Sequence, residues 1–297
     1  MTSAANTILL TGARGQLGRE LAAALRDAGN VVAFDHATLD LADPDRIVDV
    51  VRSVAPRTIV NAAAYTAVDR AEQERDAAFA INGRAPGILA AEAKRANAVL
   101  VHYSTDYVFD GEATTPYDET SSPNPINAYG ASKLEGERAI AASGAAAITL
   151  RTSWVYARHG QNFFTTMQKL AASRGELRVV ADQTGVPNWA RALARATARL
   201  IRESGPRLGE RAGLYHLSAA GSTTWYGFAS ALLQGQLARV TPIATRDYPT
   251  PARRPAYGVL DPTHFTRTFG FGLPDWQTLL HECMRSEAEP RGSAPVH

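Results

Sequence analysis

The sequence predicts an α/β fold of the Rossmann type, a doubly wound parallel sheet followed by a smaller C-terminal α/β region. Three observations predict it. Short apolar runs alternate with helical patterns through the first half of the chain, and a glycine-rich turn joins the first run to the first helix. The composition, 45% hydrophobic and 20% charged, is typical of a globular protein with a full core. Strands separated by helices form right-handed βαβ units and hence a parallel sheet covered on both faces.

The elements follow from the periodicity of the apolar residues. Continuous apolar runs predict buried strands at residues 7–10, 31–34, 58–60, 99–103 and 145–151. Helical spacing between them predicts helices at residues 17–27, 44–54, 77–96 and 129–142. After Arg151 turn residues become frequent and the alternation weakens, which indicates a second, smaller region.

Charge and cysteine content exclude several classes of protein. The 31 basic and 29 acidic side chains give a formal charge of +2, so neither nucleic acid nor an anionic membrane is an expected partner despite a pI near 8.7. The single cysteine, Cys283, can form no internal disulfide and is expected to be a half-buried helix residue. With no signal-peptide pattern at the start and no apolar stretch long enough for a bilayer, the expected location is the cytoplasm.

The first strand runs into a glycine-rich segment at residues 11–18, with Gly12, Gly15 and Gly18, that opens a helix. One glycine permits the tight turn, one lets backbone N–H groups approach a pyrophosphate, and one allows the helix to pack closely on the strand. The helix N-terminus then presents unpaired amides and the positive end of its dipole to the phosphates. Because an ordinary strand–turn–helix can carry the same glycines, the context decides the interpretation.

That context is Asp35, which ends the second strand about 20 residues further on, where an acid can hold the adenosine ribose. The alternative for Asp35 is an ordinary turn residue at a strand end. Its charge repels a 2′-phosphate and favours NADH, whereas Arg14 and His36 can accommodate NADPH. The cofactor is therefore expected to be NADPH or NADH, with the preference left open.

Tyr129 and Lys133 stand four residues apart at a helix start, so they project from one helix face. A reductase must supply a proton to the carbonyl oxygen as hydride reaches the carbon, and a tyrosine hydroxyl with a pKa near 10 is a weak acid for this at neutral pH. A nearby ammonium is expected to lower the pKa of Tyr129. Alone, the pair also fits a solvated helix face; downstream of the glycine loop it predicts a catalytic pair.

A third catalytic group is expected from the end of the preceding strand, because the carboxyl ends of parallel strands face the cofactor crevice. Thr105 is the predicted residue, with Ser104 as the alternative, and its hydroxyl would hold the substrate carbonyl. His102 is predicted to be a buried, hydrogen-bonded strand residue and not a catalyst.

These motifs in combination resemble the extended short-chain dehydrogenases and, within them, the dTDP-4-dehydrorhamnose reductase family. The resemblance rests on residues 11–18, 61–69, 104–109, Tyr129 with Lys133, 151–156 and 248–255, and it runs from about residue 8 to residue 284. It implies transfer of hydride from NAD(P)H to the C4 ketone of dTDP-4-dehydro-L-rhamnose, giving dTDP-L-rhamnose for cell-surface polysaccharide. A homodimer is common in this fold class.

The resemblance also implies roles for particular residues. Gly15, Gln16, Leu17, Asp35, Asp40 and Leu41 would line the adenosine and pyrophosphate, and Ala64, Tyr65 and Thr66 would lie against the cofactor. Thr105 and Asp106 would contact the sugar, Tyr129 assisted by Lys133 would donate the proton, and Trp154 would pack against the sugar. Arg253 and Arg254 are candidates for the nucleotide diphosphate, the alternative being a solvated loop.

A division of the chain follows from these assignments. Residues 1–153 are expected to form the dinucleotide-binding domain, with a return of the chain to it around 185–215. Residues 154–286 are expected to form most of the substrate-binding domain, and the polar tail 287–297 is expected to fray.

The sequence departs from the family pattern at Asn188, which replaces the threonine of a stretch Asp-Gln-x-Gly-x-Pro-Thr at residues 182–188 and leaves local substrate packing open. Some members bind magnesium, but no convincing carboxylate set is present and no metal site is predicted. A 4,6-dehydratase is disfavoured because Tyr107 stands where those relatives carry a glutamate. A 4-epimerase on the same scaffold and a non-catalytic NADP-binding regulatory subunit remain as alternatives.

Overall fold

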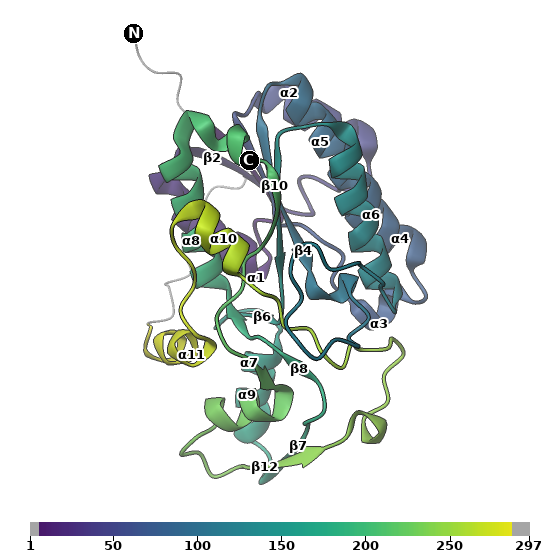
Figure 1. Cartoon of the computed structure of the whole chain (residues 1–297), viewed down its shortest axis with the longest axis vertical. Coiled ribbons are helices and arrows are strands. Elements are labelled where there is room, and N and C mark those ends of the chain that lie inside the picture. The colour runs from purple at the N-terminus through teal and green to yellow at the C-terminus, as the bar shows by residue number, and fades with distance from the viewer. Residues whose placement is uncertain (1–5, 287–297) are drawn as a thin grey trace.

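The computed structural model describes residues 6–286, so the predicted tail at 287–297 lies outside the described residues. Within this range the centre of the molecule is a six-stranded parallel sheet with strand order β10-β5-β4-β3-β1-β2 (Figure 1). Its strands are β1 (Thr7–Thr11), β2 (Asn30–Phe34), β3 (Thr58–Asn61), β4 (Val99–Thr105), β5 (Ala147–Thr152) and β10 (Gly213–His216). The predicted parallel sheet is confirmed, and each of the five predicted strands coincides with one of these elements to within two residues.

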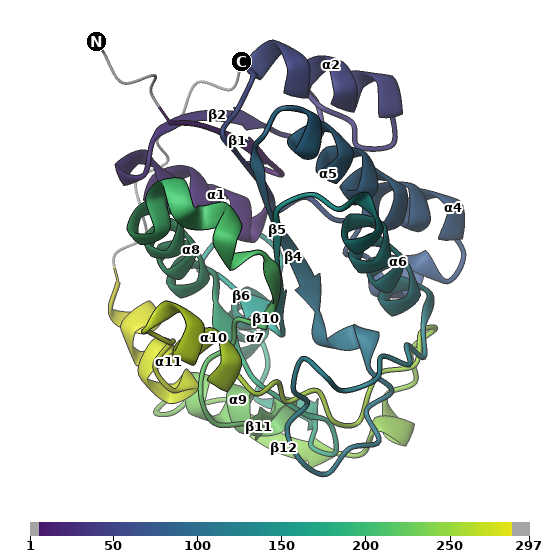
Figure 2. The same ribbon diagram turned by 45° about the horizontal axis from the view of Figure 1, so that its top comes forward.

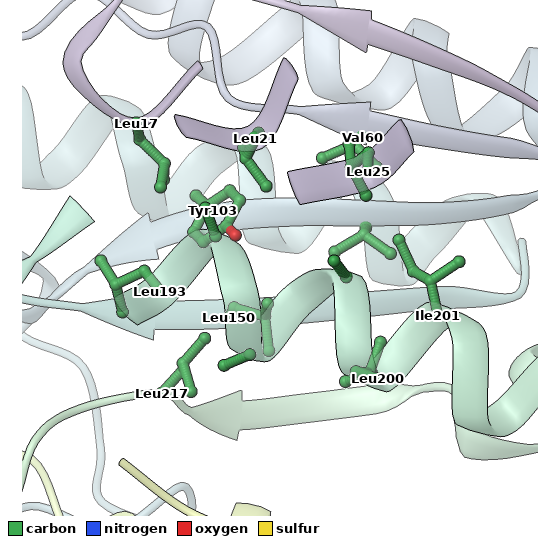
Figure 3. Close-up of a cluster of buried hydrophobic side chains, with 14 of the residues drawn as sticks. Leu17, Leu21, Leu25, Val60, Tyr103, Leu150, Leu193, Leu200, Ile201 and Leu217 are labelled. Carbon is green, nitrogen blue, oxygen red and sulfur yellow. The ribbon is translucent and has the colours of Figure 1, made fainter. Parts of the chain in front are cut away.

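Helices cover both faces of the sheet, as the doubly wound prediction requires (Figures 1 and 2). One face carries α1 (Gln16–Ala24) and α8 (Ala190–Ser204), and the other carries α2 (Pro44–Val54), α5 (Ala85–Arg95) and α6 (Ala128–Ser143). Apolar side chains of α1 and α8 meet those of β4 and β5 in a core centred on Tyr103 (Figure 3). A second core of fully buried leucine, isoleucine, valine and alanine side chains lies between the sheet and α2 and α5.

The helix predicted at residues 77–96 is continuous but irregular. It consists of α4 (Arg75–Phe79), a π-helical turn η2 (Ala80–Arg84) and α5. Pro86 stands in the first turn of α5 and has no N–H to donate to the carbonyl four residues earlier, so the regular α-helical ladder cannot pass this point. The π turn absorbs the break and turns Asn82 inward, where its side chain is almost completely buried.

The smaller region is built from short strand pairs and helices below the sheet in Figure 1. Its strands are β6 (Val155–Tyr156) with β9 (Asn188–Trp189), β7 (Glu176–Val180) with β12 (Arg239–Ile243), and β8 (Thr184–Gly185) with β11 (Thr223–Thr224). Its helices are α7 (Phe163–Ala171), α9 (Trp225–Leu232) and α11 (Trp276–Arg285). The helix α10 (Thr263–Phe269) instead packs beside β10 of the large sheet, and its Phe265 belongs to the core around Tyr103. Short segments complete the chain: α3 (Val68–Ala71), η1 (Leu25–Asp27), η3 (Asp106–Val108), η4 (Gly205–Arg211) and η5 (Thr245–Asp247).

Two further features bear on the sequence predictions. Cys283 lies on α11 as expected for a helix residue, but it is fully buried rather than half buried, and burial raises the pKa of its thiol to about 12. Among the helices of residues 6–286, none is long and apolar enough to cross a membrane.

The order of the strands decides where a ligand can bind. From β1 the chain proceeds first to β2 on one side and later to β3 on the other, so the loops that leave β1 and β3 diverge at their carboxyl ends. In open α/β sheets ligands bind in the crevice at such a point. The glycine loop follows β1, Asp35 follows β2, Thr105 ends β4 and Trp154 follows β5, so the predicted site residues gather at this one edge.

Candidate active site

The glycine loop between β1 and α1 has the geometry of a phosphate cradle. Gly12 has φ +74°, and a side chain there would place Cβ 2.7 Å from the backbone nitrogen of Ala63. At Gly18 a Cβ would lie 1.9 Å from the carbonyl oxygen of Gly12, so α1 rests directly on the loop. Gly15 is the N-cap of α1, where no side chain caps the helix and the first turn carries no acid. The first amides of α1 are therefore free to bind an anion.

Next to the cradle, Gln16 and Leu17 begin α1. Leu17 is buried in the core of Figure 3, so only its backbone faces the loop. The side-chain oxygen of Gln16 is buried and finds no hydrogen-bond partner within the described residues. A buried polar atom without a partner beside a phosphate cradle fits a bound ligand that would pair with it.

Asp35, at the end of β2, is almost completely buried and is paired with Arg14 of the glycine loop. Its Oδ1 accepts hydrogen bonds from the backbone N–H groups of Ala37 and Thr38 at 3.0 and 3.1 Å, and Arg14 Nε lies 2.7 Å from Oδ2. Burial alone would raise the pKa of Asp35, but the hydrogen bonds from Thr38 and Ala37 and the charge of Arg14 outweigh it and hold the pKa below its usual value. The carboxylate is thus charged and already neutralised by an exposed arginine.

The other predicted adenosine residues lie near Asp35 in the chain. His36 and Asp40 are exposed, with His36 Nδ1 3.7 Å from Asp40 Oδ1. The side chain of Leu41 is instead part of the core between the sheet and α2, so its side chain packs inward.

The loop after β3 carries Ala64, Tyr65 and Thr66, and Asn82 anchors it. Asn82 Oδ1 accepts from the backbone N–H of Tyr65 at 2.8 Å, and its Nδ2 donates to the Tyr65 carbonyl and to Ser132 Oγ of α6, both at 3.0 Å. The Tyr65 hydroxyl donates to Glu74 at 2.5 Å. Because Asn82 is placed by the π turn, that irregularity fixes the loop against the helix that carries Tyr129.

The start of α6 brings Tyr129 to the end of β4. Asn127 caps the helix, its Oδ1 accepting from the Gly130 N–H at 2.8 Å, and Glu72 accepts from the Ala128 N–H at 2.8 Å. A Cβ on Gly130 would lie 2.0 Å from the carbonyl oxygen of Tyr107, so this glycine lets the helix backbone touch the segment after β4. The rings of Tyr107 and Tyr129 meet edge to face, 5.5 Å between centroids.

The proton-bearing groups at this junction are strongly desolvated. Burial raises the pKa of Tyr129 to about 12; the hydrogen-bonding Thr105 hydroxyl lowers it in part and the neighbouring Asp106 raises it. Burial also raises the pKa of Asp106 to about 7, although Thr105 Oγ1 donates to Asp106 Oδ1 at 3.0 Å. The strand end and the helix start thus bring the buried Thr105 and Asp106 together with the partly buried Tyr129.

Lys133 is also buried, but it does not act on Tyr129 as expected. Its Nζ donates to the Tyr103 carbonyl at 2.6 Å and lies 3.3 Å from Nε2 of His102. Burial lowers the pKa of Lys133 to about 8, and Glu137 one turn along the helix partly opposes this. The expected lowering of the Tyr129 pKa by Lys133 is therefore wrong for this structure: the pKa of Tyr129 is raised, because desolvation is the largest influence on it.

Trp154 follows β5 in a left-handed conformation, with φ +41°. Its indole stacks on Trp225 at the start of α9, with centroids 3.5 Å apart and planes within 7°, and Gly185 lies against its edge. A side chain other than glycine in this conformation is strained, and such strain gathers at binding sites. Trp154 is thus an aromatic wall held by the smaller region.

The two arginines predicted for the diphosphate are differently placed. Arg254 Nη2 forms an ion pair with Asp69 Oδ2 at 2.9 Å and its Nη1 donates to the Ala252 carbonyl at 2.9 Å, so its charge already has a partner. The side chain of Arg253 is exposed, while its carbonyl accepts from Asn127 Nδ2 at 2.8 Å. Across residues 6–286 no group of three or more His, Cys, Asp or Glu side chains could hold a metal ion.

Comparison with known proteins matches this arrangement to one family. The family model described as RmlD substrate binding domain matches residues 6–288. The dTDP-4-dehydrorhamnose reductase of Burkholderia thailandensis is 46% identical over 294 residues, covering 94% of this chain and 98% of that protein. The reductase of the same name from Escherichia coli K12 is 44% identical over 282 residues, covering 91% and 94%.

The fold agrees as well. The crystal structure of dTDP-4-dehydrorhamnose reductase from Bacillus anthracis in complex with NADP superposes with a TM-score of 0.88 at 36% identity, covering 94% of this chain and 98% of that chain. The chain belongs to the dTDP-4-dehydrorhamnose reductase family.

Asn188, the departure from the family's sequence stretch, is a structural residue. It is fully buried; its Nδ2 donates to the carbonyls of Ser153 and Val186 at 2.8 and 3.0 Å, and its Oδ1 accepts from the Ala219 N–H at 2.7 Å. A threonine has one hydroxyl where this asparagine provides an amide with two donors and an oxygen. Asn188 therefore fixes the backbone next to Trp154 without touching the cofactor side.

Several residues of this family site escaped sequence reasoning. Asn61, Glu72, Asn82 and Asn127 place the loops and the helix that carry the predicted residues, yet none belongs to a motif with chemistry of its own. The available signal was a polar residue inside an apolar or alanine-rich run, as at Asn61 and Asn82. Such residues must find partners when buried.

We predict that Asp106→Asn stabilises the protein increasingly as the pH rises. The folded Asp106 has a pKa of about 7 against a usual 3.8, so the folded state binds this proton more tightly than the unfolded state. As Asp106 ionises between about pH 4 and pH 7, the free energy of unfolding of the wild type therefore falls by up to about 4 kcal/mol. Thermal unfolding of both proteins from pH 4.5 to 8.5 measures the difference, which should widen up to pH 7 and then stay constant.

Asp110→Asn is the matched control, since hydrogen bonds hold the pKa of Asp110 below its usual value, led by that from the Glu112 N–H. This substitution should destabilise the protein at neutral pH and have less effect under acidic conditions. A stability difference for Asp106→Asn that does not depend on pH would contradict the prediction.

Proposed function

We propose that the chain is a dTDP-4-dehydrorhamnose reductase, transferring hydride from NADPH or NADH to the C4 ketone of dTDP-4-dehydro-L-rhamnose to give dTDP-L-rhamnose. The observation that carries this proposal is the cluster of the buried Thr105 and Asp106 with the partly buried Tyr129 at the carboxyl edge of the sheet, one helical turn from Lys133. The relatives that are 46% and 44% identical over nearly their whole length bear the name of this activity.

The residues present fit a dinucleotide. The glycine loop and the uncapped start of α1 would hold the pyrophosphate, and Asp35 with Arg14 would meet the adenosine ribose. When bound, the reduced nicotinamide supplies the hydride to the ketone carbon. The Bacillus anthracis relative was crystallised with NADP, which supports the same cofactor class here.

Tyr129 would give its proton to the ketone oxygen. A pKa of about 12 keeps its hydroxyl protonated throughout the neutral range, so the proton is present, but it also makes Tyr129 a weaker acid than a free tyrosine. Thr105 hydrogen-bonds the tyrosine and would orient the sugar carbonyl towards it. Lys133 would assist this step as the resemblance implies, although in this structure its Nζ donates to the Tyr103 carbonyl and does not lower the pKa of Tyr129.

The smaller region would hold the nucleotide sugar. Trp154, stacked on Trp225, offers an aromatic face to the sugar, and the exposed Arg253 remains the candidate for the diphosphate. Arg254, with its charge paired to Asp69, would hold the segment that carries Arg253. Residues 1–153, together with α8 and β10, would then bind the cofactor. The remainder of residues 154–286 would bind the substrate. A cytoplasmic location and a homodimer remain part of the proposal.

The first experiment incubates the protein with dTDP-4-dehydro-L-rhamnose, made in situ from dTDP-glucose by the upstream dehydratase and epimerase, with NADH and NADPH in parallel. Stoichiometric oxidation of the cofactor with formation of dTDP-L-rhamnose is the expected result. A 4-epimerase would recycle its cofactor without net oxidation. A regulatory subunit would bind NADP and consume nothing, and either of these results would refute the reductase.

We predict that Tyr129→Phe lowers kcat by about 10²- to 10⁴-fold, because the ketone oxygen loses its proton donor, while cofactor affinity stays unchanged. Steady-state kinetics and fluorescence titration with NADPH measure the two quantities. Tyr103→Phe is the control: this tyrosine is more deeply buried than Tyr129, but its hydroxyl pairs with Thr197 on the opposite face of the sheet, so kcat should be retained. Turnover of the Tyr129→Phe variant within a few fold of wild type would remove Tyr129 from the mechanism.

We predict opposite shifts in cofactor preference for the two members of the Arg14–Asp35 pair. Asp35→Ala removes the charge that repels a 2′-phosphate, so the ratio of NADPH to NADH affinity should rise about tenfold. Arg14→Ala removes the cation that would meet that phosphate, so the same ratio should fall about tenfold. Dissociation constants for both cofactors give the ratios.

Arg19→Ala serves as the control for this pair, because Arg19 is also an exposed arginine near the loop but contacts only the Arg14 carbonyl. Its ratio should match wild type. An unchanged ratio in both Asp35→Ala and Arg14→Ala would place the ribose elsewhere.

A further inference from the structure

A row of buried polar side chains crosses the sheet and ends at Lys133. Thr11, Asn61 and His102 occupy the same register on β1, β3 and β4, and each is at most 1% exposed. Thr11 Oγ1 donates to Asn61 Oδ1 at 2.6 Å, and Asn61 Nδ2 lies 3.0 Å from His102 Nδ1. His102 Nε2 in turn lies 3.3 Å from Lys133 Nζ. The strand that leads into the glycine loop is thereby connected to the predicted catalytic lysine.

The hydrogen-bond partners of Asn61 fix the direction of this row. Its Oδ1 accepts both from the Thr11 hydroxyl and from the backbone N–H of Ala63, the latter at 3.3 Å. A flipped amide would set its NH₂ group against the Ala63 N–H, so the nitrogen must face His102. Nδ1 of His102 is then the acceptor, and a neutral imidazole carries its single hydrogen on Nε2.

This hydrogen points at Lys133. An ammonium group has donors only, so a protonated Lys133 meets an N–H donor 3.3 Å away. A neutral amine can accept from His102 and still donate to the Tyr103 carbonyl at 2.6 Å. Burial, reinforced by the Lys133 charge, holds the pKa of His102 well below its usual value, so His102 itself stays neutral and cannot adjust by gaining a proton.

Few other charged groups reach Lys133. On its own helix Tyr129 lies one turn before it and Glu137 one turn after it, and Glu137 is bound in a two-point ion pair by the buried Arg151 of β5. From β4 the Lys133 Nζ meets His102 and the Tyr103 carbonyl, whereas the Tyr103 hydroxyl turns to Thr197 on the opposite face. Glu137 favours the charged lysine, whereas burial opposes it.

We propose that His102 is a positioning residue of the reductase: the proton that Asn61 fixes on its Nε2 faces Lys133 and sets the pH at which that lysine loses its charge. The inference rests on the proposed function in one respect, that a charged Lys133 supports turnover. Loss of the Lys133 charge would then set the alkaline limit of activity. The row from Thr11 to His102 is in this view part of the acid–base machinery, although none of its members meets the substrate.

The test follows the charge of Lys133 directly, without substrate. The chain contains only three lysines, Lys94, Lys133 and Lys169, so ¹³C-lysine labelling gives three side-chain signals, and Lys133→Met identifies the one in question. The titration midpoint of Lys133 should lie at about pH 8 in wild type. In His102→Asn the Oδ1 can still accept from Asn61, but the shorter amide ends short of the Nε2 position, so its NH₂ group does not reach Lys133, and the midpoint should rise by about one pH unit.

Thr197→Val is the matched control, since it removes a buried hydrogen bond from the residue next to His102 but on the other face of the sheet. Its Lys133 midpoint should equal that of wild type. If His102→Asn does not fold, Thr11→Val replaces it: losing one of the two donors to Asn61 loosens the amide and should shift the midpoint in the same direction by a smaller amount. Equal Lys133 midpoints in wild type and in the folded variant would overturn the proposal.

Two further readouts separate this proposal from the proposed function. In ¹⁵N-histidine spectra of the wild type, His102 should carry its proton on Nε2; a proton on Nδ1 would refute the proposed tautomer whether or not the protein is a reductase. In the active enzyme, the alkaline limb of the kcat/KM profile should move with the Lys133 midpoint in His102→Asn and stay in place in Thr197→Val. A shifted Lys133 midpoint together with no turnover in the wild type or the variants would refute the reductase function. It would leave the proposed role of His102 towards Lys133 unaffected.

Discussion

The close contact between the first turn of α6 and the segment after β4 is the constraint on which the rest of the site depends. At Gly130 the helix backbone touches the Tyr107 carbonyl, where any side chain would intrude. This contact places Tyr129 against Thr105 and Asp106, and it places Lys133 one turn deeper against the backbone of β4. Glu72 and Asn127 satisfy the first amides of α6, so the helix starts at a fixed point rather than fraying beside the chemistry. The same Asn127 also binds the Arg253 carbonyl, so the segment that carries Arg253 is positioned from the start of α6.

Burial at this contact removes ionisable side chains from water and so shifts the pKa values of several of them. Desolvation disfavours every charge, so the pKa values of Tyr129 and Asp106 rise while those of Lys133 and His102 fall. Tyr129 therefore keeps its proton in the neutral range, whereas Lys133 holds its charge only weakly. The acid–base character of these groups thus depends more on their burial than on any single neighbour.

The features that the sequence could predict depend on interactions between neighbouring residues. The features that it could not predict depend on contacts between residues far apart in the chain. The five strands, the glycine loop and the Tyr129–Lys133 spacing are local patterns, and the turn, the cradle and the helix face follow from neighbouring residues. The pairing of Arg254 with Asp69 spans 185 residues and that of Asn127 with Arg253 spans 126, so no window of sequence contains them. The expected effect of Lys133 on Tyr129 was wrong for a related reason: the spacing of two residues on a helix says nothing of how far burial moves their pKa values. Asn82 was missed because its position depends on a π turn, and the spacing of apolar residues does not distinguish such a turn from an ordinary α-helix.

Trp154 shows how the two parts of the molecule share one site. Its left-handed backbone costs about 1–3 kcal/mol, and nothing local in β5 offsets that cost. The compensation comes from the smaller region, where Trp225 stacks on the indole and Asn188 binds the carbonyl of the preceding Ser153. Asn188 in turn holds Ala219, on the segment that follows β10 of the large sheet. The aromatic wall is therefore held in its strained position from both sides, so a substrate between Trp154 and Tyr129 would contact two regions that already share hydrogen bonds. In the proposed reductase, recognition of the sugar and placement of its ketone would for this reason depend on the same packing arrangement.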